Sequence, residues 1–193
     1  MRLIFFIIII ILILGFYFWY NYRTMTFVKS SLDNRYYMVR DLPDKDIGAN
    51  MLSTLRSNLF ILIDHLDRNK NNLYIEYKSY IEQLVYKIQD VSISESKEKD
   101  STTSYSVNKG EQLVFCIRSK KEWNSFHDMN TLMYVGLHEI AHIGCPEYGH
   151  TPLFKKIFAF FTKIAIELKI YTFIDYRASP QEYCGIYITD SII

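Results

Sequence analysis

The pentapeptide His138-Glu139-Ile140-Ala141-His142 is the segment of this 193-residue chain best suited to catalysis. Histidines four residues apart lie one turn apart on the same face of a helix, so both imidazoles can reach one metal ion. A catalytic zinc binds neutral imidazole nitrogens and keeps one coordination position open. Glu139 follows the first ligand, where it can accept a proton from the zinc-bound water and pass it to the leaving amine. The motif predicts a zinc metallopeptidase that hydrolyses protein or peptide substrates, with Zn²⁺ as its cofactor.

A third protein ligand is needed to complete a catalytic zinc site. His150 is the preferred candidate, because the loop at residues 144–149 (GCPEYG) can fold back and bring it to His142. Cys145 follows His142 so closely that its thiol would approach the metal with poor geometry. The alternatives to His150 are Glu147, then Glu167 and Cys145.

Two tyrosines and one extended segment are candidates for supporting roles. The phenolic hydroxyl of Tyr148 or Tyr183 could stabilise an oxyanion, although most of the sixteen tyrosines are expected to be packing residues. Residues 113–117 are either an edge strand that binds substrate through its backbone or a plain core strand. His65 and His127 are interpreted as ordinary surface or core histidines.

Helices are predicted on both sides of the histidine motif. Apolar residues at three- and four-residue spacing indicate helices over residues 51–66 and about 74–89. The motif helix can be capped by Asp128 or Asn130, and Gly144 is a natural end for it. The next helix begins with Thr151 as its cap and Pro152 as its first residue, and continues to about residue 168.

Strands are expected mainly before the motif helix. Residues 105–107, the turn Asn108-Lys109-Gly110 and the apolar residues 112–117 predict a β-hairpin. Residues 36–39 are expected to be extended, residues 92–103 to form a solvated loop, and residues 171–193 to be loop with one short strand. These elements predict an α+β fold.

The N-terminal segment differs in composition from the rest of the chain. Residues 3–20 are an unbroken apolar run with no charge, and a helix of that length measures about 27 Å, close to the thickness of a bilayer core. The run ends in aromatic residues, which suit a membrane interface better than the small residues of a signal-peptide cleavage site. The expectation is a transmembrane anchor at residues 1–22, a connector at 23–48 and a catalytic domain at 49–193. The chain would then be a single-pass membrane protein with the lipid bilayer as a partner.

Charge and cysteine content exclude other classes of protein. The formal net charge is +1 and no stripe of lysine and arginine is visible, so no nucleic-acid-binding surface is predicted. The three cysteines Cys116, Cys145 and Cys184 are odd in number and contain no CxxC pair. They therefore predict neither a disulfide framework nor a cysteine-rich zinc module.

Residues 138–154 (HEIAHIGCPEYGHTPLF) resemble the zinc site of the WLM (Wss1-like) metallopeptidases, which are related to the SprT type. In that family the HExxH motif is followed by a third metal-binding histidine and then by an aromatic residue. The resemblance implies that His138, His142 and His150 bind the metal, that Glu139 is the catalytic base and that Phe154 packs against the site. The separation of His142 and His150 is longer here than in the cellular members.

The resemblance is closer to the WLM-like proteins of large DNA viruses of algae and amoebae. It extends over about residues 36–189 and includes VRDLPD (39–44), residues 103–119 and EYCGI (182–186). It implies a zincin-like α+β domain and, because those proteins tend to carry an N-terminal span, a location at a viral or host intracellular membrane. Cellular WLM proteins are associated with removing proteins crosslinked to DNA, but without a basic patch that role is not expected here.

One alternative function belongs to a different class. The chain could be a catalytically silent membrane or virion structural protein that retains a zinc-stabilised fold. A purely structural site would tolerate loss of Glu139, so the presence of this residue favours the enzyme.

Overall fold

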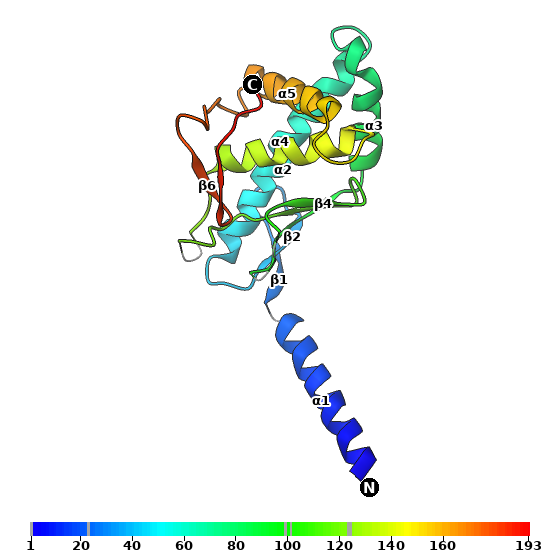
Figure 1. The fold of residues 1–193 in the computed structure, drawn as a ribbon, viewed down its shortest axis with the longest axis vertical. Coiled ribbons are helices and arrows are strands. Elements are labelled where there is room, and N and C mark those ends of the chain that lie inside the picture. Colours follow the sequence, from blue (N-terminus) through cyan, green and yellow to red (C-terminus); the bar gives the residue numbers. More distant parts are fainter. Residues whose placement is uncertain (1, 23, 99, 101, 123–124) are drawn as a thin grey trace.

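The computed structural model describes residues 2–22, 24–98, 100, 102–122 and 125–193, and the side chains of residues 2–5 and 19–22 lie outside this description. An N-terminal helix, α1 (Arg2–Tyr22), projects away from a domain in which helices cover one face of a β-sheet (Figure 1). The predicted α+β fold is confirmed.

Five short strands form the main sheet, in the order β1-β2-β3-β5-β4. Their bounds are β1 (Met25–Lys29), β2 (Tyr36–Arg40), β3 (Ser92–Glu95), β4 (Tyr105–Val107) and β5 (Gln112–Phe115). β1 and β4 run antiparallel to their neighbours, whereas β2, β3 and β5 are mutually parallel. The hairpin predicted around the Asn108-Lys109-Gly110 turn is confirmed as β4 and β5. β5 lies inside the sheet, so of the two alternatives for residues 113–117 the core strand is confirmed and the edge strand is wrong; β4 is the edge on this side.

β2 confirms the extended segment expected at residues 36–39, whereas β1 and β3 come from segments in which no strand was predicted. β1 and β2 lie in the predicted connector, and they bury Val28, Tyr37 and Val39. β3 lies in the predicted solvated loop, yet its Glu95 is only 2% exposed. The Glu95 carboxylate accepts hydrogen bonds from Arg118 Nε at 2.9 Å and from the backbone N–H of Arg40 at 2.8 Å. From the sequence alone, a charged residue is expected at the surface when its partners lie far away along the chain. This explains why residues 92–103 were wrongly predicted to be a solvated loop.

The helices of the domain are α2 (Lys45–Asn69), α3 (Lys78–Ile88), α4 (Met129–Gly144) and α5 (Pro152–Glu167), with a short 3₁₀ turn, η1 (Ile75–Tyr77), before α3. The four predicted helices are confirmed, and α2 is longer than predicted at both ends. Asp128 caps α4 by accepting from the N–H groups of Asn130 and Thr131, and Thr151 caps α5 by accepting from Phe154 N–H. These caps fix where the motif helix and its successor begin.

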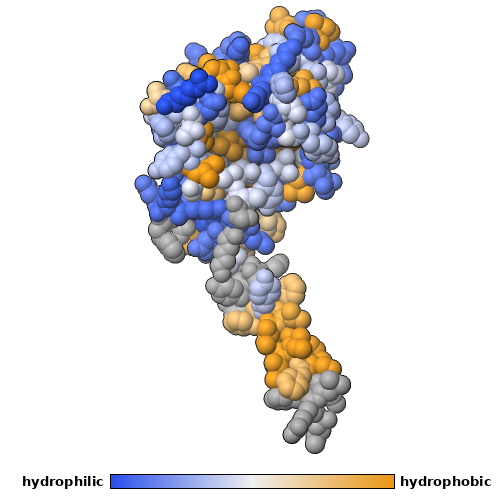
Figure 2. All heavy atoms as spheres, viewed as in Figure 1, coloured by the Kyte–Doolittle hydropathy of each residue, from blue (hydrophilic) through white to orange (hydrophobic). Residues whose placement is uncertain are grey.

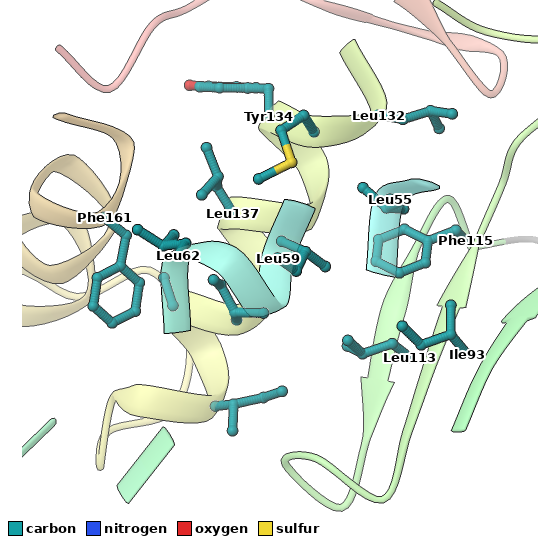
Figure 3. Packing of buried hydrophobic residues seen from close by; sticks show 14 of the residues in the cluster. Leu55, Leu59, Leu62, Ile93, Leu113, Phe115, Leu132, Tyr134, Leu137 and Phe161 are labelled. Atoms are coloured by element: carbon teal, nitrogen blue, oxygen red, sulfur yellow. The ribbon is translucent and has the colours of Figure 1, made fainter. Parts of the chain in front are cut away.

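The hydrophobic core lies between α2, the inner face of the sheet and α4 (Figure 3). α4 packs closely on α2 at Gly136, where a Cβ atom would lie 3.2 Å from the side chains of Leu55 and Leu59. The residues labelled in Figure 3 are Leu55, Leu59, Leu62, Ile93, Leu113, Phe115, Leu132, Tyr134, Leu137 and Phe161. The helix that carries the histidine motif is therefore held rigidly by its apolar face.

A small C-terminal hairpin, β6 (Gln181–Tyr183) and β7 (Ile186–Ile188), replaces the single short strand that was predicted. A disulfide joins Cys116, just after β5, to Cys184 in the hairpin turn. The prediction that the cysteines form no disulfide framework was therefore wrong for these two, while Cys145 is free and buried. Their separation of 68 residues offers no spacing pattern from which the bond could have been inferred.

The predicted transmembrane anchor at residues 1–22 is wrong, and so are the single-pass membrane location and the bilayer as a partner that followed from it. Within the part of the chain that the structure describes, no helix combines the length and apolarity needed to cross a membrane. The side chains of α1 are described over residues 6–18. These side chains are apolar and exposed (Figure 2). The side chains of Trp19 and Tyr20, assigned to a membrane interface, lie outside the description.

Candidate metal centre

Three histidine side chains converge on one point at the end of α4. His138 and His142 come from α4, and His150 comes from the loop that connects α4 to α5. The Nε2 atom of His142 lies 3.1 Å from that of His138 and 3.2 Å from that of His150, and the third separation is 3.1 Å. Among the residues that the structure describes, these three form the one group of possible metal ligands with all ligand atoms within 4.8 Å of one another.

The donor set fits a zinc ion. Nitrogen ligands about 2.05 Å from a tetrahedral zinc lie about 3.3 Å apart, close to the separations seen here. Burial and the neighbouring histidines lower the pKa of His138 to about 3, and burial, His150 and Lys109 lower that of His142 to about 4. Both imidazoles are therefore neutral near pH 7, which is the form that binds metal. Three neutral ring nitrogens that face one another repel through their lone pairs, and a cation removes that repulsion.

Phe154 forms an aromatic support for the three rings. Its ring stacks on His142 with centroids 4.1 Å apart and lies 5.0 Å from the rings of His138 and His150. The Thr151 cap and Pro152 start α5 at the position that turns Phe154 toward the cluster. Packing of this kind limits the orientations of the imidazoles.

The other candidates for the third ligand lie outside the cluster. Glu147 and Cys145 belong to the same loop as His150, but Glu147 is exposed and Cys145 is buried. Both offer backbone carbonyls, not side chains, to Lys109. Glu167 is the last residue of α5, and its charge acts on Tyr74. Of the described residues, His150 alone joins the two motif histidines.

Glu139 lies beside the histidines and is 6% exposed. Burial raises the pKa of its carboxyl to about 7, and a hydrogen bond from the backbone N–H of Ser106 in β4 acts in the opposite direction. The carboxyl group is thus held between the motif helix and the edge strand. A carboxyl with a pKa near 7 can both accept and return a proton at neutral pH.

A cleft of about 660 Å³ opens beside Glu139 and His138. One wall is the 103–106 segment that leads into β4, and another is the C-terminal hairpin with Ile186 and Ile188. α4 and α5 contribute Tyr134, Val135 and Phe158. The cleft therefore combines an apolar lining with the buried carboxylate and the histidine cluster.

The two tyrosines proposed for oxyanion stabilisation occupy different places. Tyr183 lines the cleft of Glu139, is 2% exposed, and its hydroxyl lies 2.5 Å from Ser104 Oγ. Tyr148 is 83% exposed and lines a second cavity, of about 510 Å³, that shares Ser106 and His142 with the first. The structure thus brings Tyr183, and not Tyr148, into the cleft with Glu139.

Three polar residues near the site were not identified from the sequence as part of it. Ser104 and Ser106 lie in or beside the strand that was predicted before the Asn108-Lys109-Gly110 turn, but only the pairing of β4 at the sheet edge brings them to α4. His127, interpreted as an ordinary histidine, accepts a hydrogen bond at Nε2 from Cys184 N–H and so ties the C-terminal hairpin to the segment before α4.

Sequence comparisons place this chain among proteins of large DNA viruses. No protein-family model matches the sequence. Protein R325 of Acanthamoeba polyphaga mimivirus is 44% identical over 168 residues, covering 87% of this chain and 84% of R325. Protein 136R of Invertebrate iridescent virus 6 is 39% identical over 93 residues, covering 48% of this chain and 51% of that protein.

Two crystal structures of Wss1 from Saccharomyces cerevisiae, one of them a mutant, share the fold. They superpose with TM-scores of 0.50 and 0.51 at 16% and 14% identity, over 68% of this chain and 88% and 89% of theirs. At such low identity the likeness shows the fold alone. The predicted WLM resemblance is confirmed: the chain belongs to the family of viral proteins that includes R325, and its domain has the fold of the Wss1-like metallopeptidases.

Proposed function

We propose that this protein is a zinc metallopeptidase that hydrolyses peptide bonds in the cleft beside α4. The observation that supports this most strongly is the convergence of the three histidine Nε2 atoms next to a buried carboxylate. His138, His142 and His150 would hold the zinc, and Glu139 would act on the attacking water. A structural zinc site has four protein ligands and needs no buried base beside it.

The chain's own residues supply proton transfer and positioning. A bound zinc would polarise the scissile carbonyl and lower the pKa of a water molecule. Glu139 would accept a proton from the attacking water and return it to the leaving amine. The Ser106 N–H would hold the carboxylate in place while its pKa near 7 suits both transfers.

The substrate would bind as an extended peptide along β4. β4 is an edge strand, so it can pair with one more strand, and its Ser106 already reaches the catalytic carboxylate. Apolar groups of Tyr134, Val135 and Phe158 line the cleft next to this edge. We therefore expect a large apolar substrate side chain near the scissile bond.

Tyr183 is the better placed of the two tyrosines to stabilise the oxyanion. Ser104 Oγ accepts a hydrogen bond from Cys116 N–H, so its own proton is available to the oxygen of Tyr183. In that arrangement the phenolic proton of Tyr183 remains free to be donated into the cleft. A preorganised donor of this kind is worth about a hundred- to a thousandfold in kcat.

The proposal is tested by metal analysis paired with a cleavage assay. The purified full chain should contain one zinc per molecule and cleave casein or a fluorogenic peptide library. Removal of the metal by chelation should abolish cleavage, and added Zn²⁺ should restore it. A protein that binds no zinc, or that binds zinc stoichiometrically without cleaving any member of a diverse library, would contradict the proposal.

A further inference from the structure

The loop that carries His150 has little support of its own. Residues 146–150 are all exposed, and they follow directly after α4 ends at Gly144. His138 and His142 are fixed by a packed helix, so the precision of the cluster depends on how this loop is held. Any support must come from outside the loop.

Lys109 provides that support. Its Nζ donates to three successive backbone carbonyls, those of Cys145 at 3.0 Å, Pro146 at 3.1 Å and Glu147 at 3.2 Å. It also lies over the ring of Tyr148, 4.1 Å from the centroid. All three ammonium protons are thus used on one loop. Among the described residues, no other side chain donates to the backbone of residues 145–149.

The turn that presents Lys109 is itself fixed. Asn108 and Lys109 both adopt left-handed backbone conformations, with φ of 47° and 52°, as a tight hairpin turn requires. Gly110 follows with φ of 127°, and a Cβ atom there would lie 2.6 Å from the carbonyl oxygen of Lys87. The turn therefore packs against the end of α3, and the ammonium group projects from a rigid base.

We propose that Lys109 is a positioning residue that holds the loop of residues 145–149 so that His150 reaches the metal held by His138 and His142. This inference rests on the proposed zinc site. Because Lys109 lies in the turn between β4 and β5, it also fixes the loop of residues 145–149 relative to β4, the edge strand along which the substrate would bind. Hydrogen-bonded partners of metal-binding groups typically contribute ten- to a hundredfold to metal affinity.

The charge of Lys109, considered alone, predicts the opposite effect on zinc affinity, so the two explanations can be distinguished by experiment. Lys109 is a cation whose charge acts on His142, so removing it reduces the repulsion of an incoming Zn²⁺ and should tighten binding. A positioning role predicts that the same substitution weakens binding. The Lys109→Met variant keeps the length of the side chain and the strain of the turn while it removes the donors.

The experiment measures the zinc Kd of the full chain by competition with a chelator. Lys109→Met should weaken binding ten- to a hundredfold, and Lys109→Arg should recover most of that loss, because a guanidinium can donate to the same carbonyls. Lys87→Met is the matched control, since Lys87 lines the same cavity but donates to no loop carbonyl. Its zinc affinity should be unchanged or slightly tighter. Equal or tighter binding by Lys109→Met would overturn the proposal.

A second measurement needs no metal. In the zinc-free protein, backbone order parameters from ¹⁵N relaxation should be near 0.85 for residues 147–150 in the wild type and below about 0.6 in Lys109→Met. Unchanged order parameters in the variant would also overturn the proposal.

A wild type that binds zinc without peptidase activity would contradict the proposed function. The inference about Lys109 would then still be decided by the zinc affinities and the order parameters. A wild type without zinc affinity would contradict the proposed function, and the order parameters alone would then decide whether Lys109 holds the loop.

Discussion

His138, His142 and His150 reach one point because two different structural devices place them. The first two are fixed by their four-residue spacing on a helix whose opposite face is buried in the core. The third is delivered by an exposed loop between the end of α4 and the Thr151 cap of α5. Phe154, four residues after His150 and in the first turn of α5, packs against all three rings.

Ligand substitutions should separate His150 from its neighbour Cys145. His150→Ala removes one of three converging nitrogens, so zinc binding should fall by at least about a hundredfold. Cys145→Ser should keep stoichiometric zinc, because the thiol is buried and is not among the converging ligand atoms. Zinc content after dialysis measures both. Loss of zinc in Cys145→Ser together with its retention in His150→Ala would show that the ligand assignment is wrong.

Tyr183→Phe and Tyr148→Phe test the oxyanion donor with matched changes. Tyr183→Phe should lower kcat by about a hundredfold or more with little effect on KM, because the hydroxyl would act only on the developing charge. Tyr148→Phe should leave kcat within about threefold, since that hydroxyl belongs to an exposed side chain in the second cavity. Equal effects of the two substitutions would exclude a special role for Tyr183.

The elements of the fold differ in how readily the sequence predicts them. The helices were predicted because their apolar stripes repeat every three or four residues, and their caps because Asp128, Thr151 and Pro152 have strong positional preferences. β2 confirms the extended segment expected at residues 36–39, but β1 and β3 were not predicted, because each has only four or five residues and β3 includes a buried charge. β3 pairs with β2, which lies far from it along the chain, with Met38 opposite Ser94, and no local pattern records that contact.

A buried ionic cluster explains why the VRDLPD segment and Arg118 belong to the landmarks of the family resemblance. Arg118 is fully buried and donates to Glu95 at 2.9 Å and to Asp44 at 2.7 Å. Arg40 donates through Nε to the carbonyl of Ser96 at 3.1 Å. The cluster ties the start of α2 and the ends of β2 and β3 to the segment after β5. These residues therefore position the sheet and take no part in the proposed chemistry.

The disulfide is the element-scale feature with the largest expected effect on stability. Closing a loop of 68 residues should stabilise the native state by about 2–4 kcal/mol, because it restricts the unfolded chain. Urea unfolding of the wild type with and without reductant should show that loss on reduction. The double variant Cys116→Ser/Cys184→Ser should start at the lower stability and not respond to reductant. A wild type whose unfolding is insensitive to reduction would contradict the disulfide.

At the scale of the whole molecule, the domain begins earlier than the sequence suggested. β1 pairs with β2 at five positions and buries Val28, and Ser30 Oγ donates to Asn50 at 2.8 Å. The domain therefore starts near residue 24, not at residue 49. α1, by contrast, projects away from it (Figure 1).

Two truncations test this boundary. Deletion of residues 2–23 should leave the free energy of unfolding within about 0.5 kcal/mol of the wild type. Deletion of residues 2–30 should lower it by at least about 2 kcal/mol, because it removes a strand, its hydrogen bonds and the buried side chain of Val28. Urea unfolding followed by circular dichroism measures both. Equal stability of the two truncated proteins would show that β1 is dispensable.

More of the candidate metal site than of the sheet around it could be expected from the sequence. The convergence of His150 with the two motif histidines was expected from residue types and distances along the chain, and the role of Glu139 as a base stays a prediction. The contributions of Ser106, Ser104 and Lys109 were not expected, because each depends on the hairpin of β4 and β5 packing against α4 and its following loop. Helical neighbours can be predicted from spacing, whereas neighbours across a sheet edge require the topology.

Glu139→Gln tests the central claim, that this protein uses the metal it holds, most directly. Glutamine keeps the shape of the side chain but cannot accept the proton, and Glu139 is not among the three converging ligands. The variant should retain one zinc per molecule and wild-type thermal stability, while kcat falls by at least about a hundredfold in the cleavage assay. Unchanged cleavage by a zinc-loaded Glu139→Gln protein would contradict the account, because the observed proteolysis would then not depend on this base.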